Sequence, residues 1–176
     1  MIPLSSAVSG RLTWSRTKCS RGCELLCNGE VVGSLEPTSF WSSNILAKCG
    51  DESWVFRRCG RLGAGTEIVD AISGQPMAKF KGKWSGGGTL IFPDGQSFEF
   101  ACKGVWRPVW SVLAADGQPV LRLHVSEKTV ELSHESVLPQ SRLVLLITLA
   151  LHRMRQAEED AAAIAVMSAV MAASAA

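Results

Sequence analysis

The sequence predicts an all-β protein, a closed antiparallel barrel of about twelve strands around one buried C-terminal helix. Three observations lead to this prediction. Short apolar runs separated by turn residues fill residues 11–133, a unit of about 44 residues recurs along them, and one run that is almost entirely apolar, Leu143–Leu151, follows Pro139. Strands bury alternate side chains, whereas a helix that is apolar on every side must be buried on every side. The combination indicates a sheet that encloses a helix.

Turn-forming dipeptides separate the apolar runs at regular points. Asn28-Gly29, Ser73-Gly74, Asp94-Gly95 and Asp116-Gly117 each lie between two strand-like runs. Asn-Gly and Asp-Gly are the strongest short signals for a two-residue β-hairpin, because both residues tolerate a positive φ. These pairs predict a series of hairpins, and no helical period interrupts them.

The turns also recur with a fixed spacing. Gly29, Gly74 and Gly117 lie 45 and 43 residues apart. A second class of turn lies between them, at Gly50-Asp51 and Asp94-Gly95, and "VSEKTVEL" is a weaker third copy. Three copies of a four-strand unit, the last one shortened, predict about twelve strands.

A barrel of twelve strands needs an occupant, because about eight strands already give an interior that side chains fill. The segment after Pro139 is the one helix candidate. Its apolar run rises roughly 13 Å, and extension of the helix to Met154 gives about 18 Å, which is compatible with a six-residue strand of about 20 Å. We therefore expect a helix along the barrel axis, with Arg142 at one mouth and His152 where the helix leaves the barrel. Removal of the chain from Pro139 onward should abolish folding.

Two other interpretations of the apolar run remain. A transmembrane helix needs about 20 apolar residues, and Arg142 and His152 flank a shorter run here. An ordinary buried helix packed on a β-sandwich is the second alternative.

The predicted organisation has three parts. Residues 1–10 are an N-terminal extension, residues 11–156 form one barrel domain with the plug helix at 139–156, and residues 157–176 are an Ala-rich tail. The tail is helical, disordered or attached to a membrane. The opening "MIPLSSAVSG" has neither the basic nor the apolar region of a secretory signal, so we expect a cytoplasmic location.

Composition excludes some functions. Charged residues make up 19% of the chain and the net charge is +2, which argues against a protein that coats nucleic acid, so no nucleic-acid partner is expected. Six cysteines without a signal peptide indicate free thiols. Cys19, Cys23 and Cys27 recur every fourth residue with no second close pair, which favours small side chains on a packed strand face over a zinc or thiol-redox site. We expect no metal and no cofactor.

Two glycine-rich stretches are not phosphate loops. Gly60–Gly65 and Gly86–Gly88 run into strand-like segments, whereas a phosphate loop needs the N-terminus of a helix. Bends or bulges of a curved barrel are the expected role of these glycines. Ser133, His134 and Glu135 are types used in acyl transfer, but no nucleophile elbow accompanies them. We predict that the protein is not an enzyme.

The stretch "KFKGK" gives the one surface signal. Lys79, Lys81 and Lys83 alternate with Phe80 and Gly82, so a strand would present three lysines on one face. Together with the nearby Arg57, Arg58 and Arg61, they predict a basic stripe on the barrel exterior that attracts anionic lipid headgroups. A solvated outer face that prevents edge pairing is the alternative.

The order of these features resembles the Tubby C-terminal-like superfamily over about residues 11–156. The motifs are "WVFRRCG" (Trp54 to Gly60), "KWSGGGTLIFPDGQSFEF" (Lys83 to Phe100), "KGVWRPVW" (Lys103 to Trp110) and the apolar helix, and the short bacterial members are the most similar. The resemblance implies a twelve-stranded barrel around a central hydrophobic helix. Tubby domains bind phosphoinositides, phospholipid scramblases associate with membranes, and LURP-one-related proteins are implicated in plant defence. No residue matches the phosphoinositide site, so no site residue is carried over.

The expected function is a non-catalytic binding or scaffold module with peripheral attachment to anionic membrane lipid; no protein partner can be assigned. A scramblase-like protein whose apolar helix enters the bilayer is the first alternative. A small hydrolase or thiol-redox protein is the second.

Overall fold

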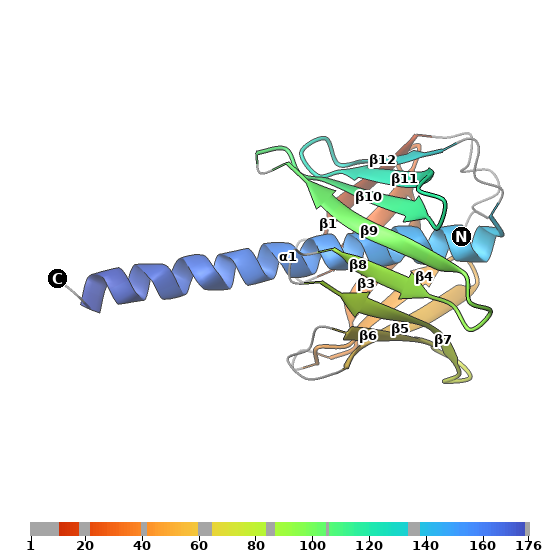
Figure 1. Cartoon of the computed structure of the whole chain (residues 1–176), viewed down its shortest axis with the longest axis horizontal. Coiled ribbons are helices and arrows are strands. Elements are labelled where there is room, and N and C mark those ends of the chain that lie inside the picture. The colour runs from red at the N-terminus through yellow and green to blue at the C-terminus, as the bar shows by residue number, and fades with distance from the viewer. Residues whose placement is uncertain are drawn as a thin grey trace.

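The computed structural model describes residues 11–17, 22–39, 42–59, 65–83, 87–104, 106–133 and 138–174. Within these residues the chain forms a closed barrel of twelve antiparallel strands, and one helix runs along the barrel and out of one end (Figure 1). The predicted fold class is confirmed. The elements are β1 (Leu12–Arg16), β2 (Cys23–Cys27), β3 (Glu30–Pro37), β4 (Ile45–Cys49), β5 (Glu52–Cys59), β6 (Gly65–Asp70), β7 (Pro76–Gly82), β8 (Gly88–Ile91), β9 (Ser97–Lys103), β10 (Val109–Ala114), β11 (Pro119–His124), β12 (Thr129–Leu132) and α1 (Gln140–Ser174).

Each strand pairs with its neighbours in sequence, and β1 closes the barrel against β12, with Leu12 opposite Val130. The predicted turns produce this meander. Gly29, Gly74 and Gly117 have φ values of 89°, 70° and 84°, a region that glycine occupies without a Cβ clash. Because successive strands run in opposite directions, the connections alternate between the two ends of the barrel. We call the end with the turns after β4, β6, β8 and β10 the turn end, and the opposite end the exit end.

The interior of the barrel is filled by α1. Every side chain from Leu143 to Leu151 is buried, and the inward side chains of the strands pack against the helix as one core. Thr148 is the polar exception, and its hydroxyl donates within the helix, toward the carbonyl oxygens of Val144 and Leu145 at 3.0 and 3.1 Å. The largest fully buried strand side chains are Phe56, Phe80, Phe98 and Phe100.

His152 lines the pocket at the exit mouth, close to where it was predicted, but it does not mark the end of burial. His152 is only 6% exposed, and its ring stacks on Phe56 with the ring centroids 5.1 Å apart. Burial of the helix continues to Gln156, about one turn further. The imidazole behaves here as an aromatic core residue rather than as a polar boundary.

The helix does not end at the barrel mouth. It begins directly after Pro139 and continues to Ser174 without Gly or Pro, the residues that commonly end a helix. Residues 157–174 of the tail are therefore helical. Figure 1 shows this part of α1 extending away from the barrel as a single straight projection.

Two of the predicted bend glycines have another role. A Cβ atom on Gly87 would lie 2.3 Å from the Phe100 carbonyl oxygen, and one on Gly88 would lie 2.4 Å from the Phe80 ring. These positions therefore need glycine for close approach of neighbouring chain segments. The register irregularities of the described pairs lie elsewhere, at Leu25/Leu26, Ile68/Val69 and Val112/Leu113. Gly60 and Gly86 lie outside the described residues.

Candidate functional site

The lysines of β7 lie on the outer face of the barrel. Lys79 and Lys81 are exposed, as is Lys83 just beyond the strand, while Phe80 between them is fully buried. Arg57 on β5 shares this outer face, because Arg57 is paired with Glu67 and Glu67 with Lys79. The strand alternation that the sequence predicted is therefore present.

The predicted stripe is nevertheless incomplete. Arg58 follows Arg57 directly and so points to the other face of β5, in register with the buried Thr66. Arg61 lies outside the described residues. Acidic residues also divide the stripe: Glu67 stands between Arg57 and Lys79 in the register, and Glu99 accepts a hydrogen bond from the Lys83 ammonium at 2.6 Å. The barrel wall thus carries mixed charge.

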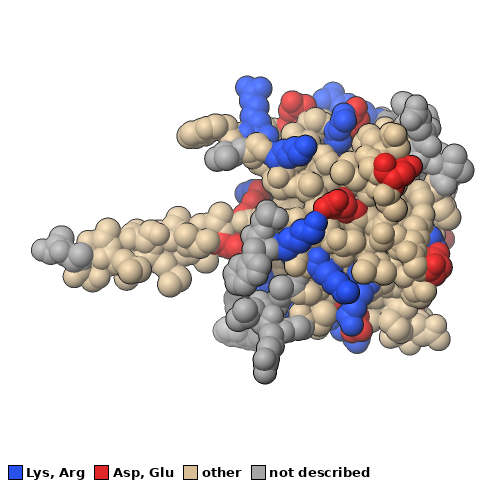
Figure 2. Space-filling model, in the orientation of Figure 1, with Lys and Arg blue, Asp and Glu red and all other residues tan. Residues whose placement is uncertain are grey.

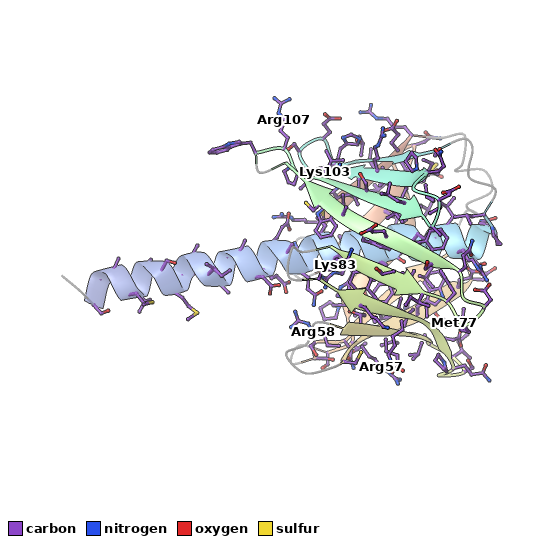
Figure 3. The ribbon with its side chains drawn as sticks, in the orientation of Figure 1. Arg57, Arg58, Met77, Lys83, Lys103 and Arg107 are labelled. Carbon is purple, nitrogen blue, oxygen red and sulfur yellow. The ribbon has the colours of Figure 1, made fainter. Side chains whose placement is uncertain are left out.

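A second group of basic residues lies at the exit end. Lys103 ends β9, Arg107 lies in the connection to β10, Lys83 follows β7 and Arg58 lines the mouth beside the helix. Figure 3 shows these four residues on the side of the barrel from which α1 projects, and Figure 2 shows Lys and Arg side chains spread over the same side. We call Arg58, Lys83, Lys103 and Arg107 the basic collar. Sequence reasoning missed Lys103 and Arg107, which it used only as parts of the motif "KGVWRPVW".

The turn end carries the opposite charge. Four successive hairpin turns each place one aspartate at this end, namely Asp51, Asp70, Asp94 and Asp116. Hydrogen bonds from Ser73, chiefly from its backbone N–H, lower the pKa of Asp70, and the Arg142 guanidinium does the same for Asp94. Both carboxylates are therefore ionised over the whole neutral range. The barrel is electrically asymmetric along its axis.

Arg142 fixes the start of the helix at the turn end. Its guanidinium donates to the Asp94 carboxylate and to the Gln96 side-chain oxygen, and it lies 4.7 Å from the centroid of the Phe92 ring. A pocket of about 530 Å³ opens beside it, with Trp54 and Leu145 among its walls. The prediction that Arg142 lies at one mouth is confirmed.

The helix leaves the barrel through a group of ion pairs. Glu158 lies 2.7 Å from Arg16 of β1 and 3.7 Å from Arg155, and Glu159 lies 3.7 Å from Arg155. A small pocket of about 80 Å³ lies here, lined in part by Arg58 and His152. Burial lowers the pKa of His152 to about 3, with the positive charges of Arg153 and Arg58 adding to the effect, so the ring is neutral at physiological pH.

One aromatic residue at the exit end is unusually exposed. Trp106 lies in the connection between β9 and β10, next to Arg107, and is 94% exposed. Tryptophan is among the most buried residues on average, so a nearly free indole ring is an informative exception. No sequence signal separated Trp106 from Trp110 four residues later, which is 2% exposed in the core.

The described cysteines are free thiols, and three of them are buried. Cys23 and Cys27 share the inner face of β2 and are buried, as predicted, while Cys19 lies outside the described residues. Burial raises the pKa of Cys23 to about 12, which keeps it a thiol. The part of the chain that the structure describes holds no group of three His, Cys, Asp or Glu side chains placed to bind a metal ion.

Comparison of the chain with family models, curated proteins and solved structures finds no match to any of them. The resemblance to the Tubby C-terminal-like superfamily therefore stays a prediction. Among the described residues, no helix has both the length and the apolar character needed to cross a bilayer.

Proposed function

We propose that this protein is a non-catalytic barrel module that binds the anionic surface of a membrane peripherally through its exit end. One observation carries the proposal, the separation of charge between the two ends. The basic collar lies at the exit end, where Glu158 and Glu159 form ion pairs with Arg16 and Arg155, while four aspartates lie at the turn end, where Arg142 pairs with one of them. An anionic surface attracts the first end and repels the second, so the charge selects both the surface and the orientation.

The charge that this orientation uses is modest but local. A basic residue close to an anionic leaflet contributes about 1 kcal/mol, and the attraction decays within a Debye length of about 8–10 Å. Only charged side chains at the end of the barrel that meets the membrane therefore contribute to the attraction. Among the described residues, neither Lys103 nor Arg107 forms an ion pair, whereas Lys83 shares its charge with Glu99. We assign the larger share of the attraction to Lys103 and Arg107.

The proposal places the protein on the cytoplasmic face of a membrane, where anionic lipid is concentrated. It requires no cofactor. The resemblance to the Tubby C-terminal-like superfamily implies the same architecture, a barrel with an axial helix. This agreement supports the proposal that the chain belongs to that superfamily. The ligand is inferred from the charge distribution alone and not from that resemblance.

The experiment is co-sedimentation with vesicles of phosphatidylcholine alone and of phosphatidylcholine mixed with phosphatidylserine. We expect binding to the mixed vesicles only. The variant Lys103→Glu/Arg107→Glu should weaken that binding by at least about 2 kcal/mol, roughly 30-fold, because two attractive charges are removed and two repulsive ones are added.

The matched control is Lys79→Glu/Lys81→Glu, which changes the net charge equally but on the barrel wall. It should bind almost as the unmodified protein does. Loss of binding in this control with retention in the Lys103/Arg107 variant would transfer the contact to the predicted stripe of Arg57, Lys79, Lys81 and Lys83. Equal binding to neutral and mixed vesicles, or none, would refute the proposal.

The two alternatives gain no comparable support. A scramblase-like protein would have to withdraw Leu143–Leu151 from the barrel, and these side chains are the middle of the core. A hydrolase or thiol-redox protein would need a polar site, and the described thiols of Cys23 and Cys49 have a raised pKa, to about 12 and about 11, chiefly because of burial.

A further inference from the structure

The part of α1 outside the barrel has no covering within the described chain. All residues from Ala161 to Ser174 are exposed, and none of them is charged. We call Ala161–Ser174 the projecting half. Figure 2 shows it as a rod without a single Lys, Arg, Asp or Glu along its length. Five large apolar side chains are more than three-fifths exposed: Ile164 65%, Val166 64%, Met167 65%, Val170 62% and Met171 69%.

These five side chains share one side of the helix. At about 100° per residue they fall within an arc of roughly 160°, and the other side consists of Ala with Ser168. A soluble surface helix has charged or polar residues opposite its apolar face, whereas here that side has no charged residue and Ser168 is its one polar residue. Monomeric soluble proteins rarely expose an apolar patch larger than a few hundred Å². The projecting half therefore has the surface of a segment that is covered in use.

Two features beside the projecting half indicate what covers it. Trp106 is almost fully exposed at the same end of the barrel, although it belongs to the β9–β10 connection and not to the helix. The basic collar lies at the same end. Tryptophan concentrates at the boundary between headgroups and acyl chains, and Lys and Arg concentrate at anionic headgroups.

We propose that the projecting half enters the acyl-chain region of one leaflet of an anionic bilayer. Trp106 then lies at the level of the headgroups together with the basic collar, and the barrel stays outside the bilayer. This inference rests on the proposed function, which requires only surface attraction, and adds insertion of a defined segment.

Length and charge fit this placement. Fourteen helical residues rise about 21 Å, and the hydrocarbon core of a bilayer is about 30 Å thick, so the projecting half is long enough for one leaflet and too short for the whole core. The acidic run that precedes it would repel anionic headgroups. Two of its three members, Glu158 and Glu159, form ion pairs with Arg16 and Arg155, which offset that repulsion.

A second copy of the chain is the competing occupant, because the Ala side would allow two helices to approach closely. Parallel pairing would bring two basic collars together and would leave both copies of Trp106 exposed. A bilayer accounts for the helix, the indole and the collar at once, and it is the occupant that we argue for.

The first test substitutes polar residues of good helix propensity for three exposed apolar side chains, Ile164→Gln/Met167→Gln/Met171→Gln. The control is Ile164→Leu/Met167→Leu/Met171→Leu, which keeps the apolar area. Because none of these side chains contacts the core, both variants should fold alike. We expect the Gln variant to bind phosphatidylcholine–phosphatidylserine vesicles at least roughly 100-fold more weakly than the Leu variant, since burial of each large apolar side chain is worth about a factor of ten or more.

The second test locates the inserted segment by labelling from a phospholipid that carries a diazirine on its acyl chain. Trypsin cleaves after Arg142, Arg153 and Arg155, so the buried and projecting parts of α1 fall in different peptides. We expect label in the peptide 156–176 and none in the peptide 143–153.

Each outcome has one meaning. Vesicle binding that is equal in the two variants, without label in 156–176, would overturn insertion and leave the surface attraction of the proposed function standing. No vesicle binding by the unmodified protein would overturn both. Label in 143–153 would mean that the helix leaves the barrel, as in the scramblase-like alternative. A dimer in sedimentation velocity that only the Gln variant loses, with no label in 156–176, would assign the apolar face to a second copy.

Discussion

The two halves of α1 are parts of one uninterrupted helix and have opposite surroundings. From Leu143 to Gln156 almost every side chain is buried, whereas from Ala161 to Ser174 every side chain is exposed. The first part begins with Leu, Ile and Val on all sides, whereas the second has large apolar residues on one side and Ala on the other. The difference shows that the surroundings of an apolar helix depend on the rest of the fold. The twelve strands enclose the first half, whereas none of the described residues covers the second half.

The largest expected effect is the difference in stability between two deletions, one of the whole helix and one of its projecting half. Removal of residues 139–176 should abolish cooperative unfolding, because the barrel loses the helix that fills it. Removal of residues 161–176 should leave the melting temperature nearly unchanged, because the deleted side chains touch no core residue. Circular dichroism with thermal melting measures both. A cooperative melt for the larger deletion would show that the strands close without the helix.

A matched pair of point substitutions gives the same contrast at single residues. Leu146 is 0% exposed and Ile164 is 65% exposed. We expect Leu146→Ala to lower the free energy of unfolding by about 2–5 kcal/mol through lost contacts and a cavity, and Ile164→Ala to change it by less than about 0.5 kcal/mol. Urea titration measures both values. Similar losses in the two variants would mean that the projecting half is packed in solution, as a paired helix would be.

A smaller effect depends on pH and concerns the end of the buried half. The pKa of His152 is about 3 in the folded chain, against a usual value of 6.5. Below pH 6.5 the unfolded chain therefore binds a proton that the folded chain does not, so stability falls as the pH is lowered from 6.5 towards 3. At about pH 5 the loss amounts to about 2 kcal/mol.

The control for this effect is His152→Phe, which keeps a ring against Phe56 and removes the titration. Between pH 6.5 and pH 5, the free energy of unfolding of this variant should lack the decrease that the unmodified protein shows. An identical pH dependence in the two proteins would mean that solvent reaches the imidazole.

The sequence was informative about the barrel because its signals are local. Asn28-Gly29, Gly74 and Gly117 need a backbone conformation that few residues tolerate, so each determines a turn and each turn determines a strand pairing. Strand alternation likewise placed Lys79 and Lys81 outside and Phe80 inside. The burial of His152 was not predicted because residue type was used as a measure of exposure; the ring is buried in its neutral form against Phe56, although its Nε2 has no hydrogen-bond partner among the described residues.

The candidate site was harder to predict because its residues are far apart in the sequence. Lys103 and Arg107 lie at the same end of the barrel as Arg58 and Lys83 only because three strand connections lie at that end. Sequence distance grouped Arg57 with Arg58, although adjacent strand residues point to opposite faces. Exposure of Trp106 also follows from the shape of its connection, which no short motif encodes. For residues 157–174 the helix was one of three alternatives, although an Ala-rich sequence without Gly or Pro favours it.

Continuity of α1 has a mechanical consequence. The helix has no hinge between its buried half and its projecting half, and its first turn is held by Arg142 to Asp94 and Gln96. A load applied to the far end of the helix is therefore transmitted along its backbone to the interior of the barrel. Under such a load, detachment of the far end of the helix competes with extraction of Leu143–Leu151 from the barrel. The force that the attachment can bear is then limited by the mechanical resistance of the core itself.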